Sequence, residues 1–98
     1  MLRELEVDGA NGRYYATRSG DIITLCHNDA AVMTPTRRQD DGYCYVEIAG
    51  KKQYIHRLIA LAFLVEEAPE GKVVHHLDRD RSNNDISNLV YLDKRRHR

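Results

Sequence analysis

The chain has 98 residues, of which 42% are hydrophobic and 31% are charged, and its formal net charge is zero. This length suits one domain with a modest core, and the neutral charge argues against a strongly basic nucleic-acid binder, although basic patches on a neutral protein still neutralise a few phosphates. No apolar run approaches the roughly 20 residues of a membrane helix, and residues 1–8 lack the apolar stretch of a signal peptide. We therefore expect a cytoplasmic protein that contacts no membrane.

The first part of the chain, residues 1–41, is predicted to contain two short strands and a long loop. Tyr14–Thr17 and Ile22–Cys26 are rich in aromatic and β-branched residues, and a Ser-Gly-Asp turn separates them. Residues 27–41 are mostly polar and include Pro35, which indicates a loop.

The middle part, residues 42–72, is predicted to be a β-hairpin followed by the central helix. Apolar and polar side chains alternate in 42–48, as in a strand with one buried face. Ala-Gly-Lys-Lys at 49–52 is predicted to form the hairpin turn. Residues 56–64, Leu61 included, are dense in helix-forming apolar side chains, and we expect them to be buried on most sides.

The last part, residues 73–98, is predicted to form two strands, a loop and a terminal helix. The runs 73–76 and 89–92 are short strands, and the polar stretch 77–88 between them is rich in Asn. Asp93 is suited to cap a final helix. A polar loop this long in a small domain is often functional. The whole chain is thus predicted to be an α+β domain with antiparallel strands.

Two strand ends and the terminal helix are predicted to bring polar side chains together. Adjacent strand residues point to opposite faces, so at a strand end one of His75 and His76 can face a metal and the other a substrate. Asn88 starts the partner strand, and His97 follows Asp93 by about one helical turn. The pattern predicts two metal ligands, one base and one amide.

These residues carry a family resemblance. The segment VVHHLDRDRSNNDISNLVYLDKRRHR (73–98) resembles the ββα-metal motif of the HNH endonuclease family, in the branch that includes phage and intron homing endonucleases. GYCYVEIAGKKQYIHRLIALAFL resembles the strand-hairpin-helix that precedes this motif, and YYATRSGDIITL is similar to a nuclease-associated modular segment. His-Leu-Asp, Asn-Asn and Asn-Leu at these spacings behind His-Arg-Leu are a specific combination, whereas a lone His-His pair is not.

The resemblance implies a role for each polar residue of the predicted site. His76 matches the general base, and His75 and His97 match two ligands of one divalent metal ion. Asn88 matches the amide that orients the base, and Asn84 matches a loop residue that caps a turn. The implied domain organisation is a single HNH domain over 1–98, with its ββα-metal motif at 73–98.

The residue types suit hydrolysis of DNA phosphodiester bonds, with 5′-phosphate and 3′-hydroxyl products. An imidazole with a pKa of about 6.5 is largely neutral at pH 7 and can take a proton from water. A divalent ion can act as a Lewis acid on the phosphate and the leaving oxygen. Imidazole ligands favour Zn, Ni, Co or Mn, whereas the family commonly works with Mg or Mn, so Mg, Mn, Zn and Ni all stay open.

Several cations outside this group are candidate DNA contacts: Lys51, Lys52, Arg57, Arg95 and Arg96. Arg57 and its neighbour His56 have a structural interpretation as well, closing the junction between sheet and helix. One active site per chain predicts nicking by a monomer and double-strand cleavage by a symmetric dimer, and a homodimer or a protein partner stays open. The alternative function is a catalytically silent DNA-binding or protein-binding factor on the same scaffold, which the neutral net charge favours.

Overall fold

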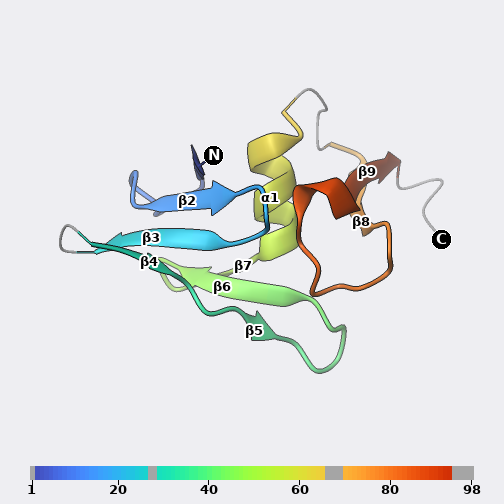
Figure 1. The fold of residues 1–98 in the computed structure, drawn as a ribbon, viewed down its shortest axis with the longest axis horizontal. Coiled ribbons are helices and arrows are strands. Elements are labelled where there is room, and N and C mark those ends of the chain that lie inside the picture. Colours follow the sequence, from blue (N-terminus) through green and yellow to red (C-terminus); the bar gives the residue numbers. More distant parts are fainter. Residues whose placement is uncertain (1, 27–28, 66–69, 94–98) are drawn as a thin grey trace.

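Three antiparallel sheets and one α-helix make up the described residues, 2–26, 29–65 and 70–93, of the computed structural model (Figure 1). The first sheet has the strand order β1-β2-β3-β4, the second β5-β6-β7, and the third is the β8–β9 hairpin. The elements are β1 (Leu2–Glu4), β2 (Tyr14–Thr17), β3 (Ile22–Cys26), β4 (Asp29–Val32), β5 (Thr36–Arg37), β6 (Cys44–Ile48), β7 (Lys51–Tyr54), α1 (Ile55–Phe63), β8 (Lys72–His76), the 3₁₀ turn η1 (Ile86–Asn88) and β9 (Leu89–Asp93). The predicted α+β class is confirmed.

The prediction of a continuous loop over 27–41 was wrong. This stretch contributes β4, which pairs with β3, and β5, which pairs with β6. All residues of β4 and β5 are exposed. A strand without a buried face has no reason to alternate apolar and polar side chains, so its sequence gives no strand signal. The same reason explains why β1, exposed throughout, was not predicted.

The β6–β7 hairpin has a tighter turn than predicted. Ala49 and Gly50 have φ values of 52° and 78°, the left-handed pair that two-residue hairpin turns require. Ile48 therefore pairs with Lys51, and Lys51 and Lys52 belong to β7 instead of the turn. The predicted alternation in β6 is confirmed, since every second side chain is buried.

The helix α1 packs at the centre of the molecule, in contact with strands of all three sheets (Figure 1). Leu58 and Ile59 are fully enclosed, but Leu61 is 46% exposed, so the prediction that the whole apolar run is buried was wrong at that position. The core is one cluster whose members come from every part of the chain: Leu5, Ala10, Ala16, Ile22, Cys44, Val46, Ile48, Ile55, Leu58, Ile59 and Leu89.

The β8–β9 hairpin frames the polar loop. His76 pairs with Leu89 at the loop end, and Lys72 pairs with Asp93 at the open end. Asp93 is the last residue of β9, and the terminal helix predicted after it, with Arg95, Arg96 and His97, lies outside the described residues. Within the described ranges, no helix is long and apolar enough to cross a membrane.

Candidate active site

His76 is held in one orientation at the end of β8. Its side chain is buried, and its Nε2 lies 2.9 Å from Oδ1 of Asn84. An amide oxygen only accepts hydrogen bonds, so Nε2 carries the proton and donates it to Asn84. This tautomer leaves Nδ1 of His76 as the basic nitrogen. In the part of the chain that the structure describes, no hydrogen bond engages Nδ1.

The amide beside His76 belongs to Asn84, whereas the resemblance implied that Asn88 would take this position. The Asn88 amide group donates to Oδ1 of Asp78 and to the Asn83 carbonyl, both at 2.9 Å. Its own oxygen accepts from the Asp78 backbone N–H at 3.0 Å. Asn88 therefore closes the loop, and Asn84 makes the contact expected of Asn88.

Asp78 is a residue of this loop that sequence reasoning did not single out, although it stands in the His-Leu-Asp element. Asn83 donates its side-chain amide to Oδ2 of Asp78 at 2.9 Å, and the Asp80 backbone N–H donates to Oδ1 at 2.8 Å. Hydrogen bonds from the Asn83 side chain, the Asp80 backbone and the Asn88 side chain lower the pKa of Asp78. The carboxylate thus organises the loop that carries Asn84.

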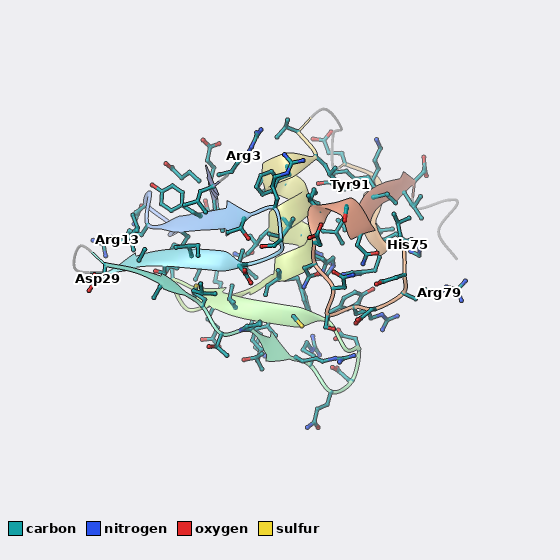
Figure 2. All side chains as sticks on the ribbon, viewed as in Figure 1. Arg3, Arg13, Asp29, His75, Arg79 and Tyr91 are labelled. Atoms are coloured by element: carbon teal, nitrogen blue, oxygen red, sulfur yellow. The ribbon has the colours of Figure 1, made fainter. Side chains whose placement is uncertain are left out.

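His75 precedes His76 and, by strand alternation, faces the opposite side of β8. It is partly exposed, whereas His76 is buried. Figure 2 shows His75 and Arg79 at the end of the molecule formed by the β8–β9 hairpin, remote from Asp29 at the other end. Among residues 2–26, 29–65 and 70–93, no group of three or more His, Cys, Asp or Glu side chains could hold a metal ion.

A cluster of aromatic rings packs against His76. The ring centre of His56, at the start of α1, lies 5.3 Å from that of His76 and 4.6 Å from that of Tyr43, on which it stacks. Tyr43 also contacts His76, with 5.9 Å between ring centres. The Arg81 guanidinium lies 4.6 Å from the Tyr43 ring centre. The cluster joins the second sheet, α1, β8 and the loop.

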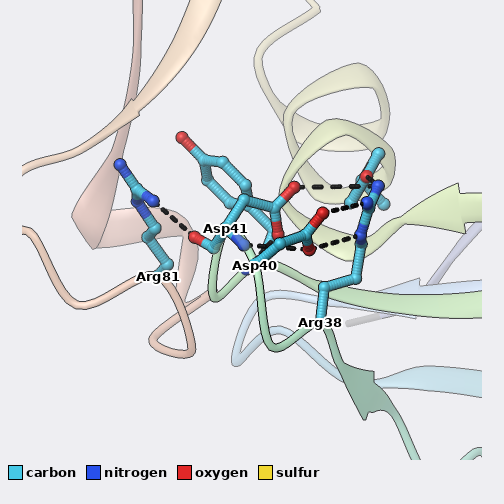
Figure 3. A network of polar contacts seen from close by, with 6 residues as sticks. Arg38, Asp40, Asp41 and Arg81 are labelled. Carbon is cyan, nitrogen blue, oxygen red and sulfur yellow. Dashed lines mark hydrogen bonds and ion pairs between the residues drawn. The ribbon is translucent and has the colours of Figure 1, made fainter.

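Two arginines fix the segment that carries Tyr43 (Figure 3). Arg38 donates from Nη1 to the Tyr54 hydroxyl at 2.5 Å and from Nε to Asp40 at 3.0 Å. The hydrogen bond from Arg38 is the main cause of the lowered pKa of Asp40. Arg81 donates to the backbone carbonyl of Asp41, which ties the 77–85 loop to this segment. The site is therefore supported from outside the β8–β9 hairpin.

A comparison with protein families matches residues 53–98 to the HNH endonucleases. The C-terminal half of the chain is therefore similar to HNH endonucleases. Two HNH endonucleases of Acanthamoeba polyphaga mimivirus are similar to it: one is 28% identical over 98 residues, covering 94% of this chain and 23% of the relative, and the other is 31% identical over 85 residues, covering 83% and 24%. The chain thus spans about a quarter of the length of these relatives.

The fold is similar to that of a solved structure of the HNH homing endonuclease I-HmuI, a protein that binds and cleaves DNA. The TM-score is 0.75 at 25% sequence identity, and the match covers 97% of this chain and 53% of the other. The HNH resemblance inferred from the sequence is confirmed, and it extends to β1–β7 and α1, which lie N-terminal to the hairpin that carries the HNH histidines.

Of the cations predicted to contact DNA, the three within the described residues do not gather at one place. Arg57 lines a groove of about 520 Å³ between the start of α1 and the β8–β9 hairpin, and its guanidinium lies 5.2 Å from the Tyr54 ring centre. Lys51 and Lys52 are exposed on β7 and do not line this groove. The other side chains of the groove include Asp41, Tyr43, His56, Lys72 and Tyr91.

The buried imidazole of His56 gives the HNH domain an acid-sensitive stability. Burial, reinforced by the nearby His76 and Arg57, lowers the pKa of His56 to about 3. The unfolded chain, where an imidazole pKa is about 6.5, binds one proton more between pH 6.5 and 3, so this residue makes stability fall as the pH falls through that window.

We expect His56→Phe to lack this contribution, because Phe does not titrate. Urea unfolding from pH 7 to 4 should give a wild-type free energy that falls more steeply than that of the variant, by up to about 1.4 kcal/mol per pH unit. If the unfolding free energies of wild type and His56→Phe change in parallel with pH, His56 is protonated in the folded protein as readily as in the unfolded chain, and the lowered pKa is refuted.

Proposed function

We propose that this HNH chain is a metal-dependent DNA endonuclease in which His76 is the general base. One observation carries the proposal: the hydrogen bond from Nε2 of His76 to Asn84 leaves the basic Nδ1 without a partner among the described residues. The family match and the similarity to I-HmuI, a DNA-cleaving protein, support a nuclease.

In this mechanism, Nδ1 of His76 accepts a proton from a water molecule that attacks the phosphorus. The bond from phosphorus to the 3′ oxygen breaks, and this oxygen takes a proton from solvent, which gives 5′-phosphate and 3′-hydroxyl ends. Asn84 holds the productive tautomer of His76, and Asn88 and Asp78 hold the loop in place. A positioned general base of this kind contributes roughly 10²- to 10⁴-fold in rate.

His75 fits the role of a metal ligand, because it is a partly exposed imidazole next to the proposed base at the end of β8. We propose that His75 and His97 together hold the metal ion, with His97 supplied from the residues after β9. When bound, a divalent ion supplies Lewis acidity toward the phosphate and its leaving oxygen. The donor chemistry of two imidazoles suits Mn, Zn or Ni better than Mg.

Removal of the metal is expected to abolish nicking of supercoiled plasmid. His75→Ala is expected to lower nicking at limiting metal concentration, because the metal ion loses one of its ligands. The assay compares EDTA with Mg, Mn, Ni and Zn, for wild type and His75→Ala at several concentrations of the most active metal. Rates that are insensitive both to EDTA and to His75→Ala would contradict the metal site. If the folded protein binds DNA in a salt-sensitive manner but does not cut it with any of the metals, it is instead a catalytically silent scaffold.

We propose that the 1–98 chain acts as one HNH domain that contacts DNA phosphates through Arg57, Lys51 and Lys52, with Arg95 and Arg96 beyond the described residues. The three cations Arg57, Lys51 and Lys52 are exposed, and within the described residues none of them forms an ion pair with a carboxylate. Each is expected to weaken DNA binding when changed to Ala and to reduce its salt dependence by about one phosphate contact.

A further inference from the structure

We propose that His56 is a positioning residue for the base: its neutral imidazole, stacked on Tyr43, is the wall that keeps the His76 ring on Asn84. This inference rests on the proposed function of His76 and adds a residue to it. His56 lies 20 positions before His76 in the sequence and belongs to another element, α1.

The contacts of His76 leave the wall a specific task. The hydrogen bond to Asn84 holds one ring nitrogen, but a single hydrogen bond allows the ring plane to rotate about it. The ring centres of His56 and Tyr43, at 5.3 and 5.9 Å, add two further contacts from outside the β8–β9 hairpin. Three contacts from separate elements fix both the position and the plane of the imidazole.

His56 itself is fixed well enough to serve as a wall. Its side chain is 5% exposed, and it stacks on Tyr43 with an angle of 27° between the ring planes. The ring of Tyr54 contacts the rings of Tyr43 and His56, and the distances between ring centres are 6.0 and 5.6 Å, respectively. Rings at such separations attract one another beyond the area that they bury.

The polar atoms of His56 do not account for its burial. Its Nδ1 is buried and has no hydrogen-bond partner within the described residues. A buried polar atom without a partner costs free energy, so the Nδ1 atom does not explain why this side chain is buried. What His56 supplies to His76 is therefore the shape of a flat ring, packed between Tyr43 and His76.

The test measures the tautomer of His76 and the nicking rate in His56→Ala, His56→Leu and His56→Phe. Long-range ¹H–¹⁵N NMR of histidine-labelled protein reports which ring nitrogen carries the proton, with His76 signals assigned by their loss in His76→Gln. Urea unfolding identifies variants that remain folded, and His56→Leu replaces His56→Ala if the latter does not fold.

Wild type should show the Nε2–H form of His76 alone. In His56→Ala or His56→Leu we expect both tautomers, and a kcat lowered roughly 10- to 100-fold with the KM for DNA unchanged. His56→Phe should restore the single tautomer and the rate. A single tautomer and an unchanged kcat in a folded His56→Ala or His56→Leu would overturn the proposal, and so would both tautomers in His56→Phe. If wild type does not nick DNA, the nuclease proposal fails, but the tautomer comparison still decides the role of His56.

Discussion

His76→Ala is expected to lower the rate of plasmid nicking by roughly two to four orders of magnitude, the usual contribution of a positioned general base. The variant removes the nitrogen that accepts the proton and also releases Asn84. Its binding to DNA should be little changed, because a buried side chain makes no phosphate contact. The loss should therefore appear in kcat.

Leu77→Ala is the matched control for this experiment. Leu77 follows His76 directly and is 55% exposed, and its hydrogen bond to the Asn88 carbonyl uses its backbone N–H, which alanine retains. We expect Leu77→Ala to nick plasmid at the wild-type rate. Equal rates for His76→Ala and Leu77→Ala in folded proteins would show that His76 is not the base.

Gly20→Ala is expected to reduce both the stability and the activity of the protein, although Gly20 lies in the turn between β2 and β3. Gly20 has a φ of +97°, and a Cβ there would lie 2.6 Å from the backbone carbonyl carbon and oxygen of Asn84. The neighbouring backbone is joined to the loop as well, since the Ile86 N–H donates to the Arg18 carbonyl at 2.8 Å. The variant must therefore displace the residue that orients His76.

The expected loss of unfolding free energy is about 2–5 kcal/mol, the sum of a left-handed backbone cost of about 1–2 and an overpacking cost of about 1–3. Gly50→Ala separates these terms, because Gly50 has a φ of +78° and a Cβ there would meet nothing within 4 Å. We expect Gly50→Ala to lower the free energy of unfolding by only about 1–2 kcal/mol and to keep the wild-type nicking rate. Urea unfolding and nicking of both variants check this, and similar effects of the two would refute the contact with Asn84.

The elements that could be predicted from the sequence are those with one buried face. The alternation in β6 and the apolar density of α1 both reflect the shared core, and both were placed to within about one or two residues. β1, β4 and β5 are exposed and hold together through backbone pairing with their neighbours, which leaves no mark on side-chain pattern.

The sequence allowed the position of the candidate site to be predicted, at the end of a strand beside a polar loop, but not the hydrogen bonds within it. The strand-end pair His75 and His76 follows from the sequence, because strand ends and polar loops have local signals. Which of Asn83, Asn84 and Asn88 faces the base depends on how Asp78 shares its hydrogen bonds, and the three amides are chemically alike.

His56 could not be assigned from the sequence because its partners are distant along the chain. The stacking on Tyr43 and the contact with His76 arise only when the second sheet, α1 and β8 pack together. From the sequence alone, a histidine at the start of an apolar helix is a junction residue or a phosphate contact. Burial without a hydrogen bond to Nδ1 is what distinguishes it.

The most direct test of the central claim is to ask whether the purified chain hydrolyses DNA to ends that ligase can reseal. Supercoiled plasmid is incubated with the protein and Mg²⁺, Mn²⁺, Ni²⁺ or Zn²⁺, or with EDTA, and the nicked product is treated with DNA ligase. We expect open circles only with the metal, and their conversion by ligase to closed circles, because hydrolysis leaves 5′-phosphate and 3′-hydroxyl ends. Intact plasmid with every metal tested, in the presence of folded protein, would contradict the assignment of this HNH chain as a nuclease.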